Sequence, residues 1–77
     1  DMYEEITVSE KLTLINELLE EKGECMFTDL ILRNGNIVDV VCAFMAVLEA
    51  VKFKNATIYQ NRMFGDIKIR PFVKNAA

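Results

Sequence analysis

A chain of 77 residues with 52% hydrophobic and 27% charged residues can form one small domain but not two separate cores. Its 3 glycines and 1 proline argue against a turn-rich all-β fold, and its lack of histidine argues against common metal and acid–base sites. We expect a single domain over residues 1–77, ordered over about 6–72. The longest apolar run is too short to span a bilayer and no signal segment opens the chain, so we expect no membrane partner and a cytoplasmic location.

The net charge of −3 is unevenly distributed along the chain. Residues 1–51 carry eleven acidic and three basic side chains, a formal charge of −8, whereas residues 52–77 carry one acid and six bases, a formal charge of +5. A basic end on an acidic body can steer a charged partner. It can equally be a solvated strand face that prevents edge-to-edge aggregation.

The first element expected is an amphipathic helix over residues 10–22. Ser9 is a suitable N-cap, Val8 could pack on the helix as a hydrophobic staple, and Gly23 can take the left-handed conformation that ends a helix. Residues 24–27 resemble a brief strand. Thr28 then predicts the start of a second, short helix through residues 29–33, ended by Asn34-Gly35.

A long third helix is expected after Asn36, and it is apolar on nearly all sides. We assign the larger side chains to the core and the smaller ones to a surface that a partner covers. The alternative is that the hairpin and the C-terminal tail fold back over the second set. The first face holds Ile37, Val38, Val41, Phe44, Met45, Leu48 and Val51; the second holds Val40, Ala43, Val47 and Ala50.

After Asn55 the apolar residues alternate, which is typical of strands. Residues 56–60 and 66–70 predict a β-hairpin joined by a turn at 61–65, and Pro71 should end its second strand. The order of the expected elements predicts an α+β winged helix with three helices and a small antiparallel sheet. That order is helix, short strand, short helix, long helix and hairpin.

Catalytic groups are scarce. Ser9 is the only serine, and no phosphate-binding glycine motif is present. Cys25 and Cys42 both lie among apolar neighbours and are expected to be buried hydrophobes, although the sequence leaves a disulfide open. We therefore expect no enzyme, with no catalytic, cofactor-binding or metal-binding residues.

The long helix also lacks the donors that a DNA-reading helix needs, because its first turns offer Val38, Asp39 and Val40. This excludes direct sequence-specific recognition of nucleic acid. Weak phosphate contacts through Arg62 or Lys68 remain open. Large apolar side chains at the hairpin turn, Met63 and Phe64, are hard to bury in so small a domain and favour a protein contact; the alternative is that Phe64 packs back under the sheet.

The stretch "VCAFMAVLEAVKFKNATIYQNRMFGDIKI" resembles the C-terminal domain of bacterial kleisins, the segregation and condensation protein A family. Members of that family typically show the pattern V-x-x-F-L-A-L-L-E-L, followed by a lysine-containing turn, a strand ending in Gln and the motif F-G-D-I-x-I. The similarity extends more loosely over about residues 6–70, and the chain departs from the family pattern at "RNGNIVD", Cys42 and Ala50. The residues that carry it are Val41, Phe44, Met45, Ala46, Val47, Leu48, Glu49, Gln60, Phe64, Gly65, Asp66, Ile67 and Ile69.

This resemblance implies a winged helix that docks on the ATPase head of a structural maintenance of chromosomes (SMC) subunit. The chain would be the C-terminal fragment of a longer kleisin, and its docking would help close the SMC–kleisin ring for chromosome condensation and segregation. Two alternatives stay open: a winged-helix DNA-binding regulator with a basic wing, and a homodimer through apolar surface. The residues predicted to bind the partner are Val40, Ala43, Val47, Arg62, Met63, Phe64 and Asp66.

Overall fold

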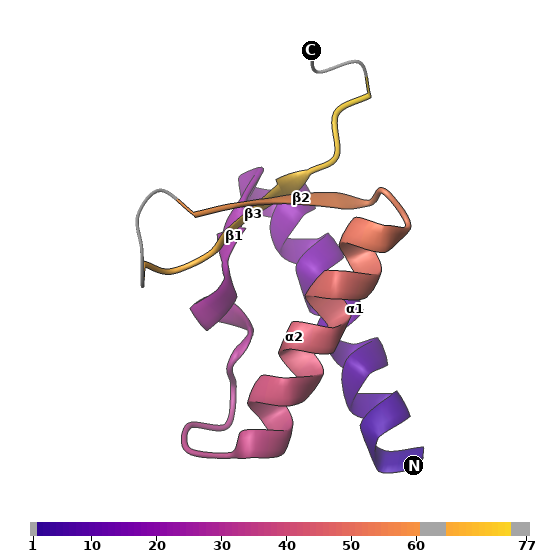
Figure 1. Ribbon diagram of the computed structural model, residues 1–77, viewed down its shortest axis with the longest axis vertical. Coiled ribbons are helices and arrows are strands. Elements are labelled where there is room, and N and C mark those ends of the chain that lie inside the picture. The colour runs from indigo at the N-terminus through magenta and orange to yellow at the C-terminus, as the bar shows by residue number, and fades with distance from the viewer. Residues whose placement is uncertain (1, 61–64, 75–77) are drawn as a thin grey trace.

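The computed structural model describes residues 2–60 and 65–74 of the chain and confirms the α+β class. Two helices cross beneath a small sheet, and the N-terminus lies at the end of the molecule opposite the sheet (Figure 1). The elements in chain order are α1 (Met2–Lys22), β1 (Cys25–Met26), η1 (Phe27–Leu30), α2 (Ile37–Lys52), β2 (Ala56–Tyr59) and β3 (Lys68–Pro71).

The three strands form an antiparallel sheet in the order β1-β3-β2. Ile69 of β3 pairs with Cys25 of β1 on one side and with Ile58 of β2 on the other, and it is fully buried. Both the hairpin and the short additional strand are therefore confirmed. Pro71 is the last residue of β3 and pairs with Ala56.

Helix α1 begins at Met2, eight residues before the predicted start. Ser9 thus lies inside the helix and does not cap it, so the predicted cap and its staple are wrong. Residues 2–9 contain no glycine or proline that would stop a helix. The predicted end is correct: Gly23 has a φ of +78° and its N–H donates to the Leu19 carbonyl at 2.9 Å.

The second predicted helix is a single 3₁₀ turn, η1, with Thr28 inside it rather than at its cap. Its start is fixed by Asp29, whose carboxylate accepts the Met26 N–H at 2.8 Å. Helix α2 begins as predicted, because the Asn36 side-chain oxygen accepts the N–H groups of Val38 at 2.9 Å and Asp39 at 3.2 Å.

The two faces of α2 are largely the reverse of the prediction. In the smaller set Ala43, Val47 and Ala50 face the core and Val40 is half-buried. The larger set is about half exposed or more, except for Val38 and Val51, which are half-buried. Small residues let α2 approach α1 closely, and a short chain lacks the material to cover the larger ones. The buried residues of α2 are Asp39, Cys42, Ala43, Ala46, Val47 and Ala50. The core also includes Ile15, Leu19, Cys25, Leu30, Ala56 and Ile69.

The C-terminus of α2 is closed by a Schellman motif. The Asn55 N–H donates to the Ala50 carbonyl at 2.8 Å, and the Lys54 N–H donates to the Val51 carbonyl at 3.1 Å. This geometry places Lys54 at a φ of 59°, a conformation that normally favours glycine. The motif turns the chain directly into β2.

Helix α1 is long enough to cross a bilayer but too polar, and α2 is too short. Within residues 2–60 and 65–74, no helix therefore meets the requirements of a membrane span.

Candidate partner-binding surface

An apolar stripe runs along the side of α2 that faces away from α1. We call it the α2 stripe and define it as Ile37, Val41, Phe44, Met45 and Leu48, whose exposed fractions are 71%, 47%, 49%, 47% and 49%. The residues recur at helical spacing, so a rigid helix presents them side by side. A contiguous exposed apolar surface of this kind marks a site of interaction.

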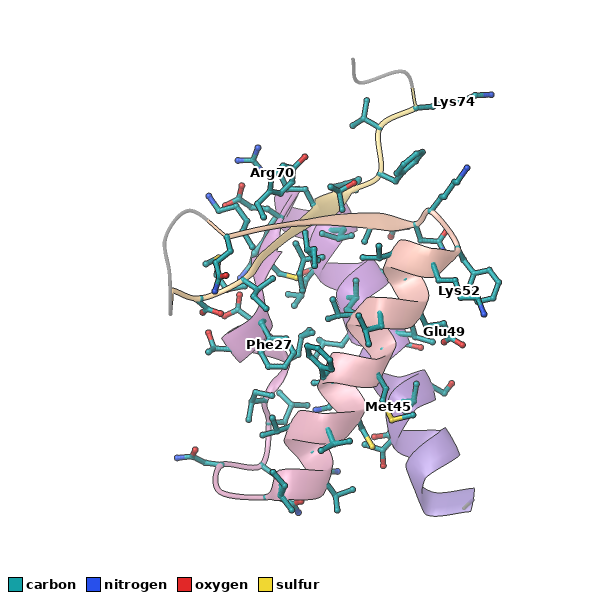
Figure 2. All side chains as sticks on the ribbon, viewed as in Figure 1. Phe27, Met45, Glu49, Lys52, Arg70 and Lys74 are labelled. Atoms are coloured by element: carbon teal, nitrogen blue, oxygen red, sulfur yellow. The ribbon has the colours of Figure 1, made fainter. Side chains whose placement is uncertain are left out.

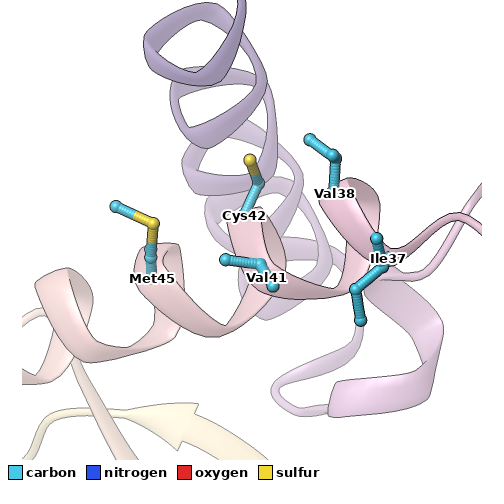
Figure 3. A pocket seen from close by; sticks show the side chains of 5 residues that line it. All are labelled: Ile37, Val38, Val41, Cys42 and Met45. Atoms are coloured by element: carbon cyan, nitrogen blue, oxygen red, sulfur yellow. The ribbon is translucent and has the colours of Figure 1, made fainter. Parts of the chain in front are cut away.

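At the N-terminal end of the stripe the surface is hollowed into a pocket of about 160 Å³. Figure 3 shows the five side chains around it, all from the first three turns of α2. A pocket of this size and apolar lining has room for one apolar side chain. Its lining consists of Ile37, Val38, Val41, Cys42 and Met45.

Midway along the stripe, Phe44 is held by an aromatic neighbour. Phe27 reaches from η1 toward α2 in Figure 2, and the two rings meet edge to face with centroids 6.3 Å apart. Such pairs contribute about 0.5–1.5 kcal/mol beyond their buried area. The contact ties η1 to the stripe and restricts the orientation of the Phe44 ring.

A buried ionic cluster lies at the N-terminus of α2. The Lys11 ammonium from α1 is 2.8 Å from Asp39 Oδ1 and also donates to the Leu30 carbonyl at 2.5 Å. Asp39 Oδ2 accepts the N–H groups of Leu32 at 2.9 Å and Arg33 at 3.1 Å, and the Arg33 guanidinium bonds Oδ1 at 3.0 Å. Lys11 is 1% exposed and Asp39 is 2% exposed.

This cluster keeps Asp39 ionised. Burial acts to raise the pKa of its carboxyl group, but the hydrogen bonds from Lys11 and from the backbone of Arg33 and Leu32 outweigh burial. The pKa of Asp39 therefore lies well below its usual range. Asp39 is therefore a core residue that joins α1, α2 and the segment between η1 and α2.

The basic C-terminal third of the chain is partly neutralised. Glu24 lies 3.1 Å from the Arg70 guanidinium and 3.7 Å from the Lys68 ammonium, and Arg70 also stacks over Tyr59 at 5.6 Å. Lys52 lies at the end of α2 and Lys74 on the segment beyond the sheet, well apart in Figure 2. The described basic side chains therefore do not form a compact patch of unpaired charge.

The predicted partner-binding residues fall into four groups. Ala43 and Val47 are 0% and 2% exposed, so their prediction as contact residues is wrong for the physical reason given above. Val40 is half-buried. Asp66 is exposed and accepts the Thr28 hydroxyl at 2.5 Å, which joins the base of the hairpin to η1. Arg62, Met63 and Phe64 lie outside the described residues.

Sequence reasoning missed both the α2 stripe and the ionic cluster. A helical signal for the cluster was present, because Lys11 stands at i, i+4, i+8 spacing with the core residues Ile15 and Leu19. Asp39 stands at the same spacing with Ala43 and Val47. Each charge therefore belongs to a buried face, where it requires a partner of opposite sign.

Both cysteines are buried, which confirms their expected place in the core. Burial, with the nearby carboxylates of Asp29 and Glu24, raises the pKa of the Cys25 thiol to about 11. A thiol of this kind stays protonated near neutral pH and is a poor nucleophile.

Comparisons of the sequence and the fold with known proteins identify relatives of this chain. No protein-family model matches the chain. Curated relatives named Segregation and condensation protein A do match it. The chain is 33% identical to the Clostridium acetobutylicum protein over 69 residues, covering 90% of this chain and 26% of the relative. It is 34% identical to the protein of Lactococcus lactis subsp. cremoris over 64 residues, covering 83% of this chain and 26% of the relative.

The protein from Brevibacillus brevis is 32% identical over 66 residues, covering 86% of this chain and 26% of the relative. The chain therefore spans about a quarter of the length of these relatives. Among solved structures, its fold matches a crystal structure of an SMC head bound to the C-terminal winged-helix domain of ScpA, with a TM-score of 0.70 and 23% identity. That match covers 88% of this chain and 97% of the other.

The fold is that of a winged-helix domain. Its helix α2 exposes apolar side chains at the positions where a DNA-binding helix exposes polar groups. The chain corresponds to the C-terminal winged-helix domain of the Segregation and condensation protein A family.

Proposed function

We propose that this domain docks on the ATPase head of an SMC subunit and thereby helps to close the SMC–kleisin ring that condenses and partitions chromosomes. Two comparisons support the proposal: the curated relatives are named for segregation and condensation, and the structural neighbour is itself bound to an SMC head. In this role the domain is a cytoplasmic, nucleoid-associated binding module that catalyses no reaction.

The α2 stripe is the observation that carries this proposal. A helix that reads DNA places arginine, lysine, asparagine or glutamine against base edges. The corresponding side chains here are hydrocarbon and thioether, which donate no hydrogen bond to base edges or phosphates and gain by leaving water. A protein surface is the partner that such a helix fits.

The stripe can supply the centre of the contact but not all of its affinity. Burying the exposed half of each side chain contributes about 1 kcal/mol, or about 5 kcal/mol for the five residues before the costs of association. A micromolar complex requires about 8 kcal/mol net. Contacts outside the stripe must contribute the rest, and Val40, Arg62, Met63, Phe64 and Asp66 remain predicted contacts for this purpose.

Calorimetric titration of the domain with the purified SMC head of the same organism tests the proposal. We expect saturable binding at one to one, which Met45→Glu on the stripe weakens at least tenfold. The matched control is Asn16→Glu, which adds the same charge at an exposed position of α1. No heat with a folded, ATP-competent head would overturn the proposal, and a dimeric mass of the isolated domain would favour self-association instead.

A further inference from the structure

Two apolar side chains extend far into solvent, one from the segment between η1 and α2 and one from the first residue of α2. Leu32 is 66% exposed and Ile37, at the start of α2, is 71% exposed. Both values exceed those of every other large apolar side chain in residues 7–60 and 65–74. Exposed loops are usually mobile, and a mobile loop is a poor place for a contact residue.

The segment between η1 and α2 is nevertheless held in place by hydrogen bonds to the buried carboxylate of Asp39. The Asp39 carboxylate accepts the N–H groups of Leu32 and Arg33 with one oxygen, and holds the Arg33 guanidinium with the other. Lys11 neutralises that carboxylate and donates to the Leu30 carbonyl at the end of η1. One buried ion pair therefore secures the backbone immediately on both sides of Ile31.

We propose that Asp39, with Lys11, is a positioning residue that presents Leu32 beside Ile37 as a rigid extension of the α2 stripe, in contact with the SMC head. This inference rests on the proposed function. Ile37 already lines the pocket, and Leu32 precedes it by five residues across the turn at 34–35. A surface ordered before binding loses less conformational entropy when the partner arrives.

The competing explanation is that the pair only stabilises the fold. Buried ion pairs can often be replaced by apolar residues of similar volume without loss of stability. Two double variants separate the explanations, because both remove the charges. Lys11→Met with Asp39→Asn retains an amide oxygen that can accept the Leu32 and Arg33 N–H groups. Lys11→Met with Asp39→Leu fills the same space but offers no acceptor.

The first measurement is amide hydrogen exchange on the unmodified chain. If Asp39 holds the segment, the amides of Leu32 and Arg33 exchange at least a hundredfold more slowly than that of Gly35 in the exposed turn. Equal rates would overturn the inference without any variant, even if the proposed partner proves wrong. This result therefore stands apart from the test of the proposed function.

The second measurement is affinity for the SMC head. We expect the Asn double variant to bind within about threefold of the unmodified chain, and the Leu double variant to bind at least tenfold more weakly while retaining the same helical circular dichroism. Equal binding by both variants would show that the pair is only structural. If the Leu variant does not fold, the exchange rates of the unmodified chain decide the question.

Discussion

Two neighbouring residues of α2 should respond to the same substitution in opposite ways. Leu48 belongs to the α2 stripe and is 49% exposed, whereas Val47 is 2% exposed in the core. Changing each to aspartate places the same charge in the same helix, one residue apart. The sequence analysis assigned Leu48 to the core, so that Leu48→Asp would unfold the domain, and the structure reverses that expectation.

The magnitudes follow from burial. Leu48→Asp loses about half of the 1.5–3 kcal/mol that full burial of a leucine contributes, plus about 0.5 kcal/mol of helix propensity, or about 1.3–2 kcal/mol in total. Val47→Asp loses a buried side chain and adds an unpaired buried charge, at about 5 kcal/mol or more. A domain of this size has a free energy of unfolding of about 4–12 kcal/mol.

Urea denaturation followed by circular dichroism at 222 nm measures both effects. Leu48→Asp should remain folded with a midpoint lowered by about 1.5 M, and it should bind the SMC head at least tenfold more weakly. Val47→Asp should lose about 5 kcal/mol or more, which lowers its midpoint by several molar and leaves it unfolded without denaturant if the unmodified chain is near the lower end of its range of about 4–12 kcal/mol. The assignment of the two faces would be refuted if Val47→Asp folded normally while Leu48→Asp did not.

Three further predictions concern single groups. Lys54→Gly should raise the free energy of unfolding by about 0.5–1 kcal/mol, because it removes a side chain from a left-handed conformation; an unchanged melting temperature would contradict this. The depressed pKa of Asp39 contributes stability that is present above its unfolded value, about 3.9, and is lost as the pH falls below it. Denaturation from pH 6 to 2 should therefore show a shallower acid loss for the Lys11→Met, Asp39→Leu variant than for the unmodified chain. The pKa of the Cys25 thiol is raised to about 11, so this thiol should react with a disulfide reagent at pH 8 far more slowly in the folded chain than in urea. Above about pH 9 the thiol ionises in the unfolded chain but not in the folded one, so the free energy of unfolding should fall as the pH rises.

Local patterns predicted most of the fold. Asn36 as a cap, Gly23 as a stop and alternation in the hairpin each depend on a few neighbouring residues, and the structure has all three. The start of α1 was missed because a good capping residue, Ser9, can also lie within a helix.

The orientation of α2 could not be predicted in the same way. A helix that is apolar on both sides has no hydrophobic contrast to indicate which side faces inward. The choice depends on how closely α1 approaches, and close approach favours Ala43 and Ala46 over Phe44 and Met45. The two buried charges were the remaining signal in the sequence. Lys11 and Asp39 can form a buried ion pair only if the face of α1 that carries Lys11 packs on the face of α2 that carries Asp39 and the small residues.

The α2 stripe also determines how the heat of complex formation should change with temperature. When a partner covers hydrocarbon side chains such as Phe44, Met45 and Leu48, water that was ordered around them is released and the heat capacity of the system falls. The enthalpy of association must then become more negative as the temperature rises, whatever its sign at the lowest temperature measured. A contact made chiefly through the lysines and arginines of the sheet would lack this slope, so a short temperature series identifies which side of the domain is covered.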